Sequence, residues 1–100
     1  KKAALITKGF KSATEPYYLD TYGWVHTQLG DFDKAQAALE QVIVEAPDVA
    51  VFNYHLAVLY VKQKNTVGAE KYLNIAKELA DKQGDVKMSE RVSALLATTK

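Results

Sequence analysis

The chain has 100 residues, of which 48% are hydrophobic and 25% are charged, enough apolar material for one packed, soluble domain. Thirteen basic residues against twelve acidic ones give a net charge of +1. That balance argues against the broad basic field with which proteins bind nucleic acid or anionic membranes. No apolar run approaches the ~20 residues that span a bilayer, which argues against membrane insertion. The absence of cysteine excludes disulfides and thiolate metal sites.

Residues 1–14 fit a short amphipathic helix, because Ala4, Leu5, Ile6 and Phe10 fall at helical spacings. Gly9 weakens that helix by roughly 1 kcal/mol relative to alanine. Pro16 suits the first turn of the next helix.

Two helices joined by a tight turn are predicted over residues 16–29 and 32–46. Their stripes are Leu19, Tyr22, His26 and Leu29, then Phe32, Ala35, Leu39, Val42 and Ile43. Gly30 breaks the first helix, and Asp31 is a natural N-cap for the second. Pro47 ends the second helix, and Asp48 is the expected N-cap of the third.

Three further helices are predicted over residues 49–63, 66–83 and 85–98. Lys64 and Asn65 replace Gly30 and Asp31 at the turn between the first two, and asparagine tolerates both left-handed and capping geometry. Gly84 ends the second, and Asp85 caps the last.

The second helix pair repeats the first after 34 residues. Gly23 becomes Ala57, Ala35 becomes Ala69, and Leu39 becomes Leu73. Small residues are needed where helices cross closely, so we expect Gly23, Ala35, Ala57 and Ala69 to be buried at the crossings. A helix pair with this register is a structural repeat.

A 34-residue helix–turn–helix of this kind resembles the tetratricopeptide repeat, whose pattern runs W-x2-L-G-x2-Y and then Ala, Phe, Ala and Pro. The first copy reads Leu19, Tyr22, Gly23, His26, Phe32, Ala35, Leu39, Val42 and Pro47, and the second reads Asn53, Leu56, Ala57, Tyr60, Ala69, Leu73 and Ala76. Leu19 and Asn53 replace the tryptophan, and Asp81 replaces the closing proline. The resemblance implies an all-α, right-handed helical-repeat solenoid.

We therefore interpret residues 1–100 as a single domain of about two and a half repeats. It consists of a half repeat at 1–14, repeats at 16–49 and 50–83, and a capping helix at 85–98. The last helix is polar outside its apolar stripe, as a solvating end cap should be. We therefore expect the chain to be the C-terminal repeats of a longer array. The run from Pro16 to Asp31 also resembles the last repeats of bacterial envelope-associated members of the family, which leaves the compartment open between cytoplasm and periplasm.

The residues favour no enzyme, cofactor or metal site. His26 and His55 lie 29 residues apart, without a metal-ligand spacing. His26 falls on the packing stripe and is expected to be a hydrogen-bonded structural histidine. The serines lack a histidine–carboxylate set, and there is no glycine-rich phosphate loop.

The remaining candidate site is a surface. In stacks of this type the first helices of the repeats line a concave groove, and the groove positions here are Tyr17, Asp20, Thr21, Trp24, Gln28, Val51, Tyr54, His55, Val58 and Lys62. Trp24, Tyr54 and Val58 are expected to form an apolar strip that holds a segment of a protein or peptide partner. Asp20 and Lys62 would bracket this strip with opposite charges.

Binding of chaperone tails is not expected, because the Lys and Asn clamp with which some members of the family hold them is absent from these positions. A purely structural role is the rival interpretation: an end cap of a longer array, or a self-association surface, with Trp24 packed inside the array.

Overall fold

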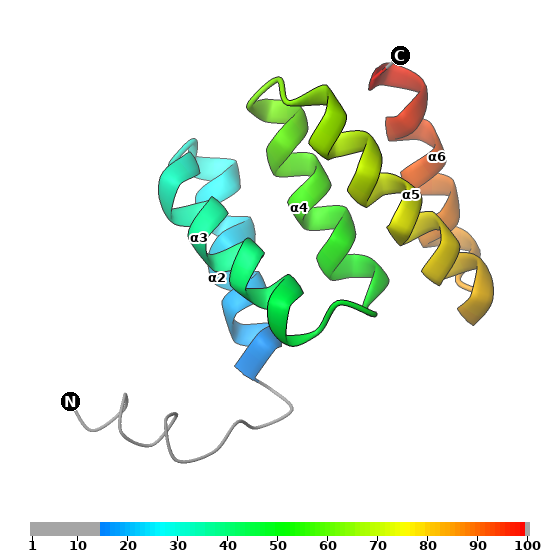
Figure 1. Cartoon of the computed structure of the whole chain (residues 1–100), viewed down its shortest axis with the longest axis horizontal. Coiled ribbons are helices and arrows are strands. Elements are labelled where there is room, and N and C mark those ends of the chain that lie inside the picture. Colours follow the sequence, from blue (N-terminus) through cyan, green and yellow to red (C-terminus); the bar gives the residue numbers. More distant parts are fainter. Residues whose placement is uncertain (1–14, 100) are drawn as a thin grey trace.

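A computed structural model of the protein describes residues 15–99, which form five α-helices and no strand. In chain order these are α2 (Glu15–Leu29), α3 (Phe32–Glu45), α4 (Ala50–Lys62), α5 (Thr66–Gln83) and α6 (Val86–Thr99). Each helix runs back along its predecessor after a short turn (Figure 1). The all-α prediction is confirmed. The half repeat expected at residues 1–14 lies outside the described residues.

The helices form two layers. Each helix packs against its neighbours in sequence, and α4 also contacts both α2 and α6. The first helices of the pairs (α2, α4 and α6) therefore form one layer, and α3 and α5 form the other. Within residues 15–99, no helix is long and apolar enough to cross a bilayer.

Most helix ends follow the local signals in the sequence. Gly30 and Gly84 take left-handed backbone angles, with φ of 84° and 73°, which glycine adopts without steric cost. The Asn65 side chain accepts a hydrogen bond from the Gly68 amide at 3.0 Å, and Asp85 accepts one from the Met88 amide at 3.1 Å. Both side chains thus satisfy amide groups that the first turn of a helix leaves free.

Lys64, which stands at the position of Gly30, takes the left-handed conformation (φ 63°), and Asn65 caps α5. Two other details of the turns differ from expectation. Asp31 occupies the N-cap position of α3 but makes no capping hydrogen bond with its side chain. Its carboxylate lies instead 3.6 Å from His26 Nδ1 and 3.8 Å from Lys34 Nζ.

The start of α4 is the second difference. Its N-cap is Val49 in extended conformation, so Asp48 does not cap the helix. Asn53 stabilises this turn instead, because its side-chain amide donates to the carbonyl oxygens of Pro47 at 3.0 Å and Val49 at 2.9 Å. The asparagine that replaces the family tryptophan is therefore a buried turn-binding residue.

The small residues lie where they were expected. Gly23, Ala35, Ala57 and Ala69 are all buried. A Cβ added to Gly23 would stand 2.5 Å from Leu39 Cγ, a separation that real Cβ contacts essentially never show. The backbone of α2 thus approaches the Leu39 side chain of α3 too closely for any residue but glycine.

The core continues along the stack in two clusters. One is built from α3, α4 and α5 and contains Ala35, Leu39, Leu56, Leu59, Tyr60 and Ala69. The other joins α4, α5 and α6 and contains Ala50, Ala57, Leu73, Ala76, Ala80, Met88 and Val92. The helix pairs thus bury their apolar faces against one another, which a single pair cannot do for itself.

Candidate functional site

The ten groove positions expected from the sequence all lie on α2 and α4, the first two helices of one layer. Since α2 and α4 are in contact, the structure brings the central positions of the two helices together. Three side chains meet at these central positions: Asp20, Trp24 and His55.

His55 of α4 is held between two groups of α2. Its Nδ1 lies 2.9 Å from Asp20 Oδ1 and 2.8 Å from Asp20 Oδ2. Its ring stacks on the Trp24 indole, with centroids 4.1 Å apart and an interplanar angle of 24°. Asp20 is only 6% exposed, so its carboxylate is directed at His55 and not at solvent. We call these three residues the Asp–His–Trp cluster.

The Asp–His–Trp cluster changes the role expected for Asp20. A carboxylate that is buried and hydrogen-bonded to His55 is not a free charge at the edge of an apolar strip. Its effect is to fix the imidazole plane, and that plane in turn supports one face of Trp24. Trp24 is partly buried as a result.

Tyr54 continues the aromatic row toward α6. Its ring centroid lies 6.0 Å from that of His55. On its other side Tyr54 lines a shallow pocket with four residues of α6: Arg91, Ala94, Leu95 and Thr98. These four residues were not among the predicted groove positions, because the last helix was expected to be an end cap that is polar outside its apolar stripe. Their spacing of three, four and seven residues was the available signal for a shared helical face.

The outer groove positions differ in exposure. Tyr17 is 56% exposed and makes an edge contact with Phe52 at 5.0 Å between ring centroids. The Thr21 hydroxyl donates to the Tyr17 carbonyl at 3.0 Å. Gln28 and Lys62 are exposed, and Val51 and Val58 are partly buried.

Val51 and Tyr54 also pack against the core cluster of α4, α5 and α6. Of the predicted strip of Trp24, Tyr54 and Val58, Tyr54 is therefore anchored in the core, and all three side chains are partly accessible.

Within residues 15–99 no group of three or more His, Asp or Glu side chains could hold a metal ion. His26 contacts the Tyr22 ring at 4.4 Å between centroids, as a packing residue would. However, its buried Nδ1 lacks a hydrogen bond within the described part of the chain, contrary to expectation.

One polar network outside the groove joins α5 to α6. The Ser89 hydroxyl donates to Asp81 at 2.7 Å, and the Lys77 ammonium donates to Asp81 and to Ser89, each at 3.2 Å. The hydrogen bond from Ser89, followed by the one from Lys77, holds the pKa of the Asp81 carboxyl below its usual range. These contacts explain the three side chains as a helix–helix link.

An all-α stack of antiparallel helix pairs that repeats after 34 residues defines a helical-repeat fold. The family model of the tetratricopeptide repeat matches residues 26–97, and the chain belongs to this family. The fold is similar to the solution structure of a tetratricopeptide repeat domain protein from Salinibacter ruber, with a TM-score of 0.77 and 20% sequence identity. The match covers 90% of this chain and 91% of that chain. No curated protein matches the chain significantly.

Membership of the family carries a general function. Tetratricopeptide repeats mediate protein–protein interactions, and their superhelical stacking creates the concave surfaces that they use. They are typically non-catalytic scaffold modules.

Proposed function

We propose that the first-helix layer of α2, α4 and α6 binds a segment of a protein partner, with Trp24 as the central anchor. The observation that carries this proposal is the Asp–His–Trp cluster, in which His55 supports one face of the Trp24 ring at 4.1 Å. An aromatic side chain held in one orientation loses little conformational entropy on binding.

The aromatic row supplies the contact area. Trp24, His55 and Tyr54 follow one another across α2 and α4, and the pocket beside Tyr54 extends the row to Leu95 of α6. Tryptophan and tyrosine dominate the binding energy of protein interfaces. A partner segment crossing the three helices would place apolar side chains on Trp24 and in the pocket next to Tyr54.

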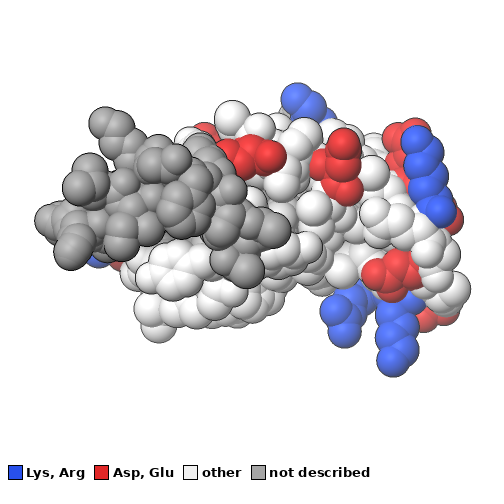
Figure 2. Space-filling view, turned by 90° about the horizontal axis from the view of Figure 1, so that it is seen from below, with Lys and Arg blue, Asp and Glu red and all other residues white. Residues whose placement is uncertain are grey.

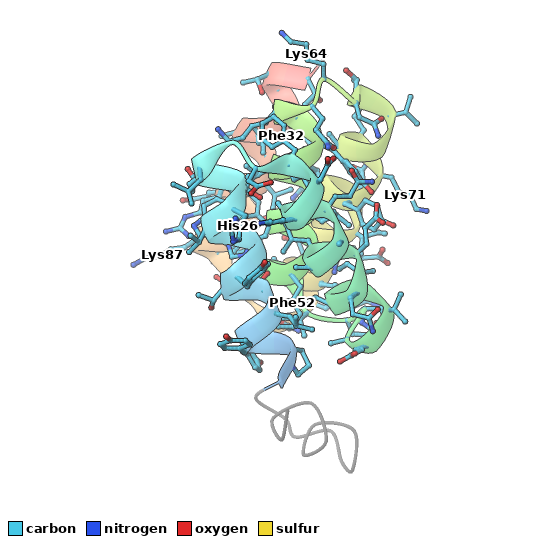
Figure 3. All side chains as sticks on the ribbon, turned by 90° about the vertical axis from the view of Figure 1, so that its left-hand side faces the viewer. His26, Phe32, Phe52, Lys64, Lys71 and Lys87 are labelled. Carbon is cyan, nitrogen blue, oxygen red and sulfur yellow. The ribbon has the colours of Figure 1, made fainter. Side chains whose placement is uncertain are left out.

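The charges of this layer favour an acidic partner segment. Asp20 is engaged by His55, whereas Lys62 and Arg91 are exposed. Lys87 of α6 projects to the same side as α2 (Figure 3). Figure 2, which shows the molecule from below, has acidic and basic side chains interspersed on that face. A few exposed cations on the layer would give local steering and not a broad field.

The test uses peptides selected on the whole chain from a random peptide library, with no assumption about the native partner. Trp24 is the only tryptophan, so its fluorescence reports on this surface alone. Bound peptide should shield Trp24 from acrylamide. Trp24→Ala should weaken binding by about thirtyfold or more, the loss expected for a central aromatic anchor.

Val44→Ala on α3 and Val67→Ala on α5 are the matched controls, because these exposed apolar side chains (75% and 81%) lie in the other layer. Both variants should bind like the unmodified chain. Selected peptides that keep their affinity for Trp24→Ala would refute the groove. Circular dichroism of each variant separates lost binding from lost folding.

The structural alternative, an end cap or self-association segment of a longer array, has one observation in its favour. Outside its packed stripe, α6 exposes mainly charged and small residues: Lys87, Glu90, Arg91, Ser93, Ala94 and Ala97. A polar outer face is what terminal repeats require. This interpretation is preferred if Trp24→Ala leaves peptide binding intact.

A further inference from the structure

The Asp–His–Trp cluster leaves one polar atom open. His55 Nδ1 faces the two oxygens of the Asp20 carboxylate at 2.9 and 2.8 Å, and the face of its ring lies on Trp24. The second ring nitrogen of His55, Nε2, has no hydrogen bond within residues 15–99. It is not among the buried unpaired atoms of that part of the chain, so solvent reaches it. The His55 side chain as a whole is 16% exposed.

Asp20 fixes which ring nitrogen of His55 carries the proton. A carboxylate only accepts hydrogen bonds, so Nδ1 is the donor in this pair. In a neutral imidazole the other nitrogen then carries a lone pair and only accepts. Asp20 is thus a positioning residue, which presents Nε2 to the surface as a hydrogen-bond acceptor.

We propose that His55 Nε2 determines the specificity of this surface, because the partner segment must place a hydrogen-bond donor, a backbone N–H or a side-chain O–H, against it. This role of His55 rests on the proposed function, since the donor belongs to the segment that covers Trp24. The two rings are only 4.1 Å apart between centroids, so a segment that lies on the indole also reaches the edge of the imidazole.

The donor is a requirement because a segment that covers Trp24 also displaces water from Nε2. An acceptor that loses its water and gains no donor keeps the full cost of desolvation. Sites with such a polar group reject a ligand that lacks the matching group more strongly than they reject one that lacks a methylene. We expect a missing donor to weaken binding by about tenfold or more.

The same atom restricts where the acidic residues of the partner lie. A carboxylate against Nε2 would bring two acceptors together, so acidic residues are excluded from that point. Lys62 and Arg91 are exposed, and neither forms an ion pair within residues 15–99. Lys62 lies seven residues beyond His55 on α4, about 10 Å along the helix, and Arg91 of α6 lines the pocket beside Tyr54. The expected segment therefore carries a donor at its centre and acidic residues toward the two cations.

The first experiment uses the peptides selected on the whole chain, at about pH 8.5, above the range in which histidine ordinarily changes charge. Each backbone N–H of a peptide is replaced in turn by N-methyl, and each side-chain hydroxyl is deleted in turn. One of these changes should weaken binding by about tenfold or more. The series in which it occurs shows whether the backbone or a side chain supplies the donor.

Variants of the chain assign the lost hydrogen bond to His55. Asp20→Leu with His55→Phe keeps an aromatic ring beside Trp24 and removes the acceptor and the carboxylate together. In this variant the penalty for the missing donor should fall to about twofold or less. His26→Phe removes the other histidine and is the matched control, which should keep the full penalty. Circular dichroism confirms that each variant is folded.

A second variant keeps the imidazole and changes only its proton. The amide of Asp20→Asn can donate to His55 Nδ1 as well as accept from it, so Nε2 is no longer held as an acceptor. The penalty for the missing donor should therefore fall in Asp20→Asn as well.

Nitrogen-15 NMR of the histidine rings tests the position of the proton without a peptide. The chain contains two histidines, so His26→Phe assigns the signals. At about pH 8.5, above the ordinary titration range of histidine, His55 should show a protonated Nδ1 and an unprotonated Nε2. Bound peptide should shift the Nε2 signal.

The outcomes separate the acceptor role of His55 from the groove itself. A penalty that persists in His26→Phe and disappears without the His55 acceptor supports the role. Peptides that depend on Trp24 but whose donors show no coupling to His55 overturn the role and leave the groove intact. A protonated Nε2 in the unmodified chain also overturns it. Peptides that are indifferent to Trp24→Ala refute the groove, and the acceptor role with it.

Discussion

Gly23→Ala is the substitution that tests the packing between α2 and α3 most directly. The new methyl group would stand 2.5 Å from Leu39 Cγ and 2.7 Å from Leu39 Cδ2. Leu39 is 1% exposed, so its side chain has no solvent-filled space into which to turn. Either the leucine leaves its rotamer or the two helices move apart.

Two effects of opposite sign decide the magnitude. Overpacking a core typically costs about 1–3 kcal/mol, whereas replacing glycine by alanine in a helix interior stabilises by about 1 kcal/mol. We therefore expect a net loss of about 1 kcal/mol of unfolding free energy, with an upper limit of about 2 kcal/mol. Helix propensity alone predicts a gain, so the sign of the change distinguishes the two effects.

The assay is urea denaturation followed by circular dichroism, applied to a double-mutant cycle. Leu39→Ala removes the two atoms that the new methyl group would meet. In that background Gly23→Ala should stabilise by about 1 kcal/mol, the propensity gain without the clash. If Gly23→Ala stabilises the chain equally in both backgrounds, the close approach of α2 to Leu39 is refuted.

Two further predictions concern the polar contacts between helices. Asp20→Ala should lower the unfolding free energy by about 1–2 kcal/mol. Asp20→Asn should lower it by less, because asparagine can still accept a hydrogen bond from His55. Equal urea midpoints for the two variants would contradict a stabilising hydrogen bond between residue 20 and His55. Burial, and then the hydrogen bond to Glu40, raises the pKa of the Tyr60 phenol above its ordinary value of 10.0. The stability that goes with this shift is fully present below pH 10 and is lost as the pH rises through the folded-state pKa. Absorbance titration should therefore show one tyrosine that ionises after the others, and Tyr60→Phe should remove that late step.

Helix existence and helix ends were largely determined by local sequence. The α5 prediction of residues 66–83 matches the structure, and the other described helices differ by one residue at one or both ends. This agreement has a local cause, because glycine at positive φ and side chains such as Asn65 act within a few residues of themselves. The failures at Asp48 and Asp31 are also informative. Each has capping chemistry, but Asn53 fixes the turn before α4, and the Asp31 side chain lies near His26 and Lys34 instead.

The 34-residue register also predicted which small residues lie buried at the helix crossings. Gly23 and Ala35 lie at equivalent points to Ala57 and Ala69, and all are buried. Repetition makes this possible, because a residue type that recurs at the same point of each unit reports a contact that recurs as well.

Only the tertiary structure decided the chemistry of the groove. Asp20 and His55 are separated by 35 residues and belong to different helix pairs, so no spacing within a helix could pair them. Whether they meet depends on the rotation and translation between successive repeats. The same geometry places Trp24 against His55 and Arg91 beside Tyr54. The sequence by itself determined the helices and their repeat. The stacking geometry decided which of the predicted groove residues remain accessible to solvent, because a contact between repeats depends on the packing of whole helix faces and not on local spacing.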